Sequence, residues 1–198
     1  MYDVILAFLA ILNPFALFLY LRPTMKDLPL SAYAEAIVKA SMISLSIFLI
    51  FIVFHDFLFD TLFKIEFDAF RIFGGIILFS FAFLFIVKGQ KAFIQLKGNV
   101  DDLAAEIALP YMVGAGTISL AILLREDHGL LTAGWLLFVI MAIHTLILVG
   151  LQYLRSNIEN KPGRLAFDYV MEILLRISGF FLGAIGINMV LVGIRAFF

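Results

Sequence analysis

Two short stretches of the chain combine proline, glycine and small polar residues inside otherwise apolar segments. The first is Asn13-Pro14, and the second runs from Pro110 to Ser119. A proline lacks a backbone N–H, so each stretch should leave polar main chain without its usual helical partner. Freed carbonyls and the N-terminal ends of half-helices can bind a small ligand. The predicted substrate-binding residues are Asn13, Pro14, Pro110, Gly114, Gly116, Thr117 and Ser119.

The composition predicts that these stretches lie in a membrane. Apolar residues make up 64% of the 198 residues and charged residues only 15%, whereas soluble domains are about 45–50% apolar and about 25% charged. We therefore expect an all-α integral membrane protein with six transmembrane helices, each near the roughly 17–25 residues that cross hydrocarbon. The six predicted spans are 3–21, 34–55, 69–88, 105–124, 131–153 and 170–194.

The two halves of the chain repeat one pattern. Arg71-Ile72-Phe73-Gly74 opens one apolar run and Arg176-Ile177-Ser178-Gly179 lies in another, and each comes two spans after a proline-containing segment. Three crossings per half turn the second half upside down, which is typical of inverted repeats in small-molecule transporters. The predicted organisation is one transmembrane domain, 1–198, made of two inverted three-helix repeats at about 1–92 and about 100–198.

Each proline also has a simpler interpretation. A proline kink can persist in a membrane helix when neighbouring helices satisfy the groups that it frees. Two prolines in corresponding spans of opposite direction favour broken helices instead. The sequence therefore predicts that spans one and four break at Pro14 and Pro110 and meet beside a polar cavity.

Two arginines inside predicted spans each have an acid one helical turn earlier. Asp68 precedes Arg71 and Glu172 precedes Arg176, and such pairs lie on one helix face. One interpretation is that the arginines are anchors that extend their charged ends toward the membrane surface. The other is that they border the opening of the central site or hold a broken helix in place. We assign all four residues a gating or structural role.

His144 is the only mid-span group that titrates near neutral pH. It either forms a hydrogen bond with a neighbouring helix or carries a proton that couples transport to an ion gradient. Signatures of hydrolases, phosphate-binding loops and metal-ligand clusters are missing from the sequence. We therefore expect no enzyme activity and no cofactor other than a coupling cation, Na⁺ or H⁺.

The distribution of basic residues predicts the orientation. Nine of the 14 Lys and Arg residues follow spans one, three and five, and three lie on the opposite side. Basic loops face the cytoplasm, so both termini of this multi-pass protein should lie outside the cytoplasmic membrane. The net charge of −1 gives no bias toward nucleic acid. The expected partners are membrane lipid, a small-molecule substrate and, in a homo-oligomer, further copies of the chain.

Five segments, in this order and spacing, resemble the MarC family, also called the small neutral amino acid transporter family. The resemblance covers nearly the whole chain and implies a six-span bacterial or archaeal inner-membrane protein. It also implies transport of glycine, alanine and similar neutral amino acids, driven by an ion gradient. The segments are Ile11-Leu12-Asn13-Pro14-Phe15, Arg22-Pro23-Thr24-Met25, Arg71-Ile72-Phe73-Gly74-Gly75-Ile76, Leu109-Pro110-Tyr111-Met112-Val113-Gly114-Ala115-Gly116-Thr117-Ile118 and Arg176-Ile177-Ser178-Gly179.

The chain departs from the family pattern at both proline segments. Ala16 and Leu17 stand where the family commonly has glycine, and Gly114-Ala115-Gly116 lacks the family's second proline. The expected function is alternating-access transport of a small neutral amino acid. The alternatives are a non-transporting scaffold or sensor subunit, a small-solute channel and an exporter. The scaffold alternative predicts that side chains fill the space around the two prolines.

Overall fold

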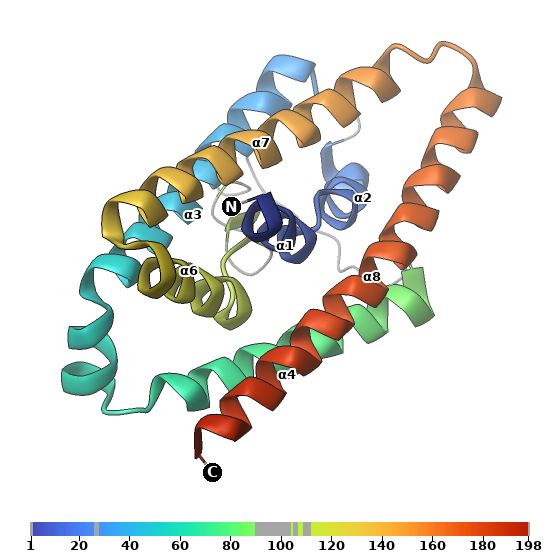
Figure 1. Cartoon of the computed structure of the whole chain (residues 1–198). Coiled ribbons are helices and arrows are strands. Elements are labelled where there is room, and N and C mark those ends of the chain that lie inside the picture. Colours follow the sequence, from blue (N-terminus) through green and yellow to red (C-terminus); the bar gives the residue numbers. More distant parts are fainter. Residues whose placement is uncertain (1, 26–27, 90–103, 105–106, 109–111, 198) are drawn as a thin grey trace.

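The structure is a computed structural model that describes residues 2–25, 28–89, 104, 107–108 and 112–197. The regular elements in these ranges are all helical (Figure 1). Five helical segments are long and apolar enough to cross a membrane, and they correspond to predicted spans one, two, three, five and six. They are Ile5–Arg22, Leu30–Phe63, Phe67–Lys88, Leu130–Ser156 and Lys161–Ala196. The predicted fourth span, 105–124, lies partly outside the described residues, and Pro110, its predicted break, is not described. In the described part the chain is not helical at Val113 and Gly114 and becomes helical at Ala115, where α6 (Ala115–His128) begins; we call Gly114 the second break.

The first span consists of two helices that meet at Asn13. Helix α1 (Tyr2–Leu12) ends there and α2 (Pro14–Met25) begins at the next residue. Asn13 has a φ of 42°, a left-handed conformation that asparagine tolerates better than most residues. Pro14 occupies the first position of α2, where its missing N–H leaves no hydrogen bond unmade. The predicted break is therefore present, centred one residue before Pro14.

Helices α3 (Leu30–Asp56) and α7 (Leu130–Ser156) pack side by side in opposite directions. The Ser41 and Thr145 hydroxyls lie 2.6 Å apart, and Leu49 lies beside Gly134. The buried positions of the two helices correspond. Adding 100 to the number of each buried residue of α3 gives the number of a buried residue of α7. The set in α3 is Tyr33, Ala36, Ile37, Ala40, Ser41, Ser44, Phe48 and Ile52. The set in α7 is Ala133, Leu136, Leu137, Ile140, Met141, His144, Leu148 and Gln152.

Helices α4 (Phe67–Lys88) and α8 (Lys161–Phe197) form the most extensive helix pair. A Cβ placed on Gly75 would lie 2.5 Å from the carbonyl oxygen of Gly186, so only glycine permits this approach. Gly89 lies beside Glu172 at one end of the pair and Gly193 lies beside Asp68 at the other. The two helices are therefore antiparallel.

Helix α8 begins nine residues before the predicted start of its span at 170. The additional turns contain Pro162 and Gly163, a composition that is more typical of a turn than of a helix. Asn160 instead caps the helix, since its Oδ1 accepts the N–H of Gly163 at 2.7 Å. A proline is well tolerated in the first turn that follows such a cap.

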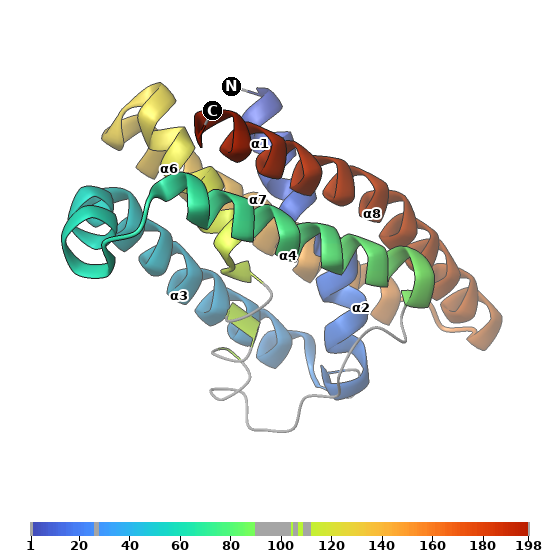
Figure 2. The same ribbon diagram turned by 90° about the horizontal axis from the view of Figure 1, so that it is seen from below.

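The two antiparallel pairs enclose α1, α2 and α6 (Ala115–His128), as Figures 1 and 2 show. Helix α2 is buried at every position from Ala16 to Leu21, each at most 5% exposed. A helix that is buried on all sides lies in the middle of its bundle. A short π-helical segment, η1 (Phe57–Phe63), follows α3 and precedes α4. The centre of the molecule is thus formed by the broken first span and the described part of the fourth.

Candidate functional site

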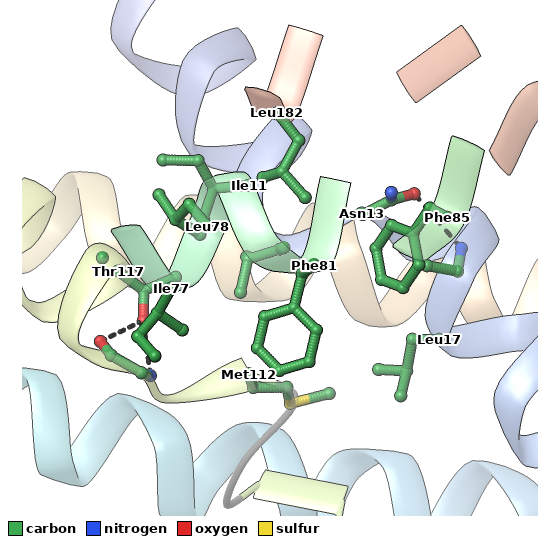
Figure 3. Close-up of a pocket in the computed structure, with 14 residues that line it drawn as sticks. Ile11, Asn13, Leu17, Ile77, Leu78, Phe81, Phe85, Met112, Thr117 and Leu182 are labelled. Carbon is green, nitrogen blue, oxygen red and sulfur yellow. Dashed lines mark hydrogen bonds between the residues drawn. The ribbon is translucent and has the colours of Figure 1, made fainter. Parts of the chain in front are cut away.

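A cavity lies where α2 and α6 begin (Figure 3). The centre of a water-sized sphere can occupy about 60 Å³ inside it. By this measure one water needs roughly 10–15 Å³. The space therefore suits a few waters or one small solute. Residues from both breaks, from α4 and from α8 line it: Ile11, Leu12, Asn13, Ala16, Leu17, Ile77, Leu78, Phe81, Phe85, Met112, Gly114, Gly116, Thr117 and Leu182.

Asn13 caps the helix that starts at the first break. Its Oδ1 accepts the N–H of Ala16 at 3.1 Å, and its main-chain carbonyl accepts the N–H of Leu17 at 3.1 Å. The side chain is thereby fixed as the N-cap of α2. Its Nδ2 is buried and has no hydrogen-bond partner among the described residues. This lining residue therefore has a buried amide nitrogen whose two N–H groups form no hydrogen bond with the described residues.

Thr117 caps the second break in a related way. The N–H of Gly114 donates to Thr117 Oγ1 at 2.9 Å, and the Thr117 hydroxyl donates to the Gly114 carbonyl at 3.0 Å. Gly114 is the N-cap of α6 and Thr117 is its third residue. Asn13 and Ala16 hold the same two positions relative to α2. At both breaks a hydrogen bond therefore links the N-cap residue to the third residue of the helix. The side-chain oxygen belongs to the cap residue at Asn13 and to the third residue at Thr117.

Gly74 brings α4 against the start of α6. A Cβ on Gly74 would lie 2.8 Å from the carbonyl carbon of Ala115 and 2.9 Å from the N of Gly116. A Cβ on Gly116 would in turn lie 2.6 Å from Leu78. The Arg71-Ile72-Phe73-Gly74 motif therefore has a structural role, because its glycine lets a neighbouring helix touch the second break.

The wall opposite the two breaks is apolar. Ile77, Leu78, Phe81 and Phe85 present one face of α4 to the cavity, and Leu182 comes from α8 (Figure 3). The prediction of a polar cavity is therefore wrong for most of the wall and holds only near the breaks. The spacing of the α4 residues is that of one helix face, a signal that the sequence contained and that our predictions did not use.

Two predicted binding residues, Pro14 and Ser119, lie outside the lining of the cavity, and a third, Pro110, is not described. Pro14 starts α2 but lies outside the lining set. Ser119 is fully buried, and its hydroxyl has no partner within the described ranges. Pro110 is among the residues that the structure does not describe. Of the seven predicted binding residues, the cavity thus brings together Asn13, Gly114, Gly116 and Thr117.

The two arginines differ in their contacts, and neither lines the cavity. Arg176 pairs with Glu172 at 3.0 Å and donates to the carbonyl of Ile86 at 2.9 Å, near the end of α4. It thus ties α8 to a helix of the other half of the chain. Arg71 lies 3.9 Å from Asp68, and its buried Nε has no partner in the described part of the chain.

His144 is fully buried in α7, outside the cavity lining. Its ring lies beside the main-chain carbonyl of Leu12, at the end of α1. That carbonyl lost its helical donor when the Ala16 N–H bonded to Asn13. Neither ring nitrogen completes a hydrogen bond with any described residue. His144 therefore contacts the first break from the side of α7 and not through the cavity.

A cluster of three charges around the buried Asp168 was missed by our sequence predictions. Asp168 of α8 is 6% exposed. Its Oδ2 lies 2.7 Å from Arg22 of α2, and its Oδ1 accepts from Nε of Arg155 of α7 at 2.9 Å. Our predictions used both arginines as basic residues that follow spans one and five, and Arg22 also as part of a family segment, but linked neither to Asp168. No local spacing could have linked residues this far apart in sequence.

A second cluster joins the ends of α3 and α6. Arg125 donates through Nη2 to Oδ2 of Asp56 at 3.3 Å, and its Nη1 lies 3.0 Å from Nδ1 of His55. Glu126 lies 3.9 Å from the same histidine. The Asp56 side chain is 69% exposed, whereas that of Asp168 is 8% exposed. The second cluster is therefore more accessible to water than the first.

Comparison with known proteins identifies the family. The profile of MarC family integral membrane proteins matches residues 1–198. A UPF0056 membrane protein of Methanocaldococcus jannaschii is 30% identical over 94% of this chain and 91% of its own length. UPF0056 membrane proteins of Pyrococcus horikoshii and Bacillus subtilis (YvbG) are 27% and 25% identical, over 85% and 81% of this chain and 80% and 77% of their own lengths. No solved structure matches the chain significantly. The chain therefore belongs to the MarC family of integral membrane proteins.

Proposed function

We propose that the protein is a secondary transporter that moves a small neutral amino acid, such as glycine or alanine, across the cytoplasmic membrane. The observation that carries this proposal is the cavity at which α2 and α6 both begin. Helix ends that meet inside a membrane protein beside a cavity are typical of substrate sites in transporters. The scaffold alternative required side chains to fill this space, and the cavity argues against it.

We infer that the two halves form inverted repeats. The antiparallel α3 and α7 share one register of buried positions. In α4, Gly75, Leu78, Ala82 and Phe85 are buried. Adding 104 to each number gives a residue of the antiparallel α8 that is also buried. The linked cap and third residue of α2 and α6 add a third correspondence. Alternating access would follow from rocking of one repeat against the other.

The lining groups suit a zwitterion with a small side chain. The N-terminal ends of α2 and α6 and the free Nδ2 of Asn13 would bind the carboxylate. The C-terminal end of α1, at Ile11 and Leu12, would present the negative end of its dipole to the ammonium group. The apolar face of α4 would contact the methylene or methyl group. A cavity with room for a few waters suits a solute with a short side chain.

Transport would be coupled to a cation, Na⁺ or H⁺. His144 is our candidate proton carrier because it is buried, unpaired within the described residues and beside the first break. We place both termini outside the cytoplasmic membrane, as the distribution of Lys and Arg indicates. A channel or an exporter would use the same cavity and would differ in the direction and coupling of the flux.

Filling the cavity tests the proposal. Ala16→Leu adds three carbon atoms at a lining position, so we expect uptake of labelled glycine into proteoliposomes to fall at least about tenfold, which corresponds to a loss of about 1.4 kcal/mol. Ala142→Leu is the matched control, because Ala142 lines an exposed groove between α3 and α7 on the outer surface. We expect this control to transport normally.

Two results would count against the proposal. Equal uptake by the two leucine variants would exclude the cavity as the route. Uptake no faster than in empty vesicles, for glycine, alanine and serine alike, would exclude small neutral amino acids as substrates.

A further inference from the structure

The two charged clusters occupy opposite ends of the molecule. The Asp168 cluster (Arg22, Arg155 and Asp168) includes the end of α7, and the Arg125 cluster (His55, Asp56 and Arg125) includes the end of α3. Because α3 and α7 are paired and antiparallel, their C-terminal ends point in opposite directions. The clusters therefore lie on opposite sides of the cavity, along the direction in which a solute must pass.

Each cluster also holds the far end of a half-helix that starts at the cavity. Arg22 lies in the last turn of α2, and Arg125 lies in the last turn of α6. From the cavity the two half-helices extend in opposite directions (Figure 2). Both arginines contact carboxylates of other elements, Asp168 in α8 and Asp56 in α3. The two half-helices are thus tied at their outer ends by the same chemistry.

We propose that these clusters are the two gates of the cavity, an inference that rests on the proposed transport function. Separation of Arg22 from Asp168 frees the end of α2 and opens one route. Separation of Arg125 from Asp56 and His55 frees the end of α6 and opens the opposite route. Both clusters are formed in this structure. Each gate acts through the helix that also presents a cap residue to the cavity, so a bound solute and a gate can influence one another.

The two gates differ in strength. Asp168 is buried and contacts two arginines, whereas Asp56 is largely exposed and contacts one. Water weakens an exposed ion pair much more than a buried one. The Arg125 gate therefore opens more easily, and the Asp168 gate is the one that holds the resting state.

Cysteine accessibility tests the two gates without knowledge of the substrate. The chain has no cysteine, so Ala16→Cys places a single thiol at the cavity. A small membrane-impermeant methanethiosulfonate cation is applied to spheroplasts and, separately, to inside-out vesicles. Arg22→Gln is compared with Arg125→Gln in this background. Arg164→Gln serves as the matched control, because Arg164 is an exposed arginine whose Nε donates to the nearby Ile158 carbonyl and which forms no ion pair within the described ranges.

We expect Arg22→Gln to raise the labelling rate at least about tenfold from one side of the membrane only, and Arg125→Gln to raise it from the other side only; tenfold corresponds to about 1.4 kcal/mol. Arg164→Gln should change neither rate. Labelling that rises equally from both sides, or unchanged labelling in both variants, would overturn the proposal. Arg155→Gln and Asp56→Asn provide a second variant for each gate, and each must act from the same side as its partner.

The gates and the transport proposal can fail separately. If the variants change labelling from one side each but the protein takes up no small amino acid, the clusters are gates and the proposed substrate class is wrong. Normal uptake of glycine with no sided effect in any of the four variants would retain the transporter and remove the gates.

Discussion

Replacing Asp168 by alanine should lower the free energy of unfolding by about 3–5 kcal/mol, the usual cost of removing one partner from a buried ion pair. Asp168 is 6% exposed, and both of its carboxylate oxygens contact arginines. Its loss would leave Arg22 and Arg155 facing one another without a counter-charge. Asp168 belongs to α8 and the two arginines to α2 and α7, so the substitution would remove the ion pairs that join these three helices at one point.

Unfolding by SDS in mixed micelles, followed by circular dichroism, measures this change. The matched control is Glu35→Ala, which removes an exposed acid paired with Lys39 one turn away. Exposed pairs of this kind contribute about 0–1 kcal/mol, so the control should unfold almost as the unmodified protein does. Equal unfolding of the two variants would show that the Asp168 cluster does not stabilise the bundle.

Replacing Asn13 by aspartate should abolish most transport while the helix stays capped. A carboxylate oxygen can accept the Ala16 N–H as Oδ1 of Asn13 does now, and aspartate is a good N-cap. The helix N-terminus favours the ionised form. The unused N–H groups of Nδ2 would be replaced by negative charge beside the substrate carboxylate. Since a hydrogen bond to a charged group contributes about 1.5–3 kcal/mol, uptake of glycine should fall about tenfold to a hundredfold.

Thr117→Ser is the matched control for this substitution. Serine retains the hydroxyl that bonds to both the N–H and the carbonyl of Gly114, so we expect uptake to be nearly unchanged. Initial rates in proteoliposomes, normalised to the amount of reconstituted protein, provide the comparison. If Asn13→Asp transports glycine as well as Thr117→Ser does, the Asn13 amide takes no part in binding.

Features that depend on neighbouring residues could be predicted from the sequence. The break at Asn13 follows from the proline beside it, and the Arg176–Glu172 pair follows from a spacing of one helical turn. The spacing of three residues between Asp68 and Arg71 was less informative than the spacing of four between Glu172 and Arg176, since the nearest charged atoms of the first pair lie 3.9 Å apart. Local rules name the residues that can meet, and packing around the helix decides the distance.

Features that depend on how helices pack could not be predicted in this way. Arg22, Arg155 and Asp168 come from three helices, and only the arrangement of α2, α7 and α8 brings them together. The apolar wall of the cavity depends on Gly74, which lets α4 touch the start of α6. From the sequence Gly74 could be recognised as a packing residue, but its partner could not.

Equilibrium binding of tritiated glycine to the purified protein shows whether a small amino acid occupies the cavity between α2 and α6. We expect saturable binding at one site per chain, displaced by unlabelled alanine. Ala16→Leu should abolish this binding and Ala142→Leu should leave it unchanged. If Ala16→Leu binds glycine with unaltered affinity, the solute binds somewhere other than between the two broken spans.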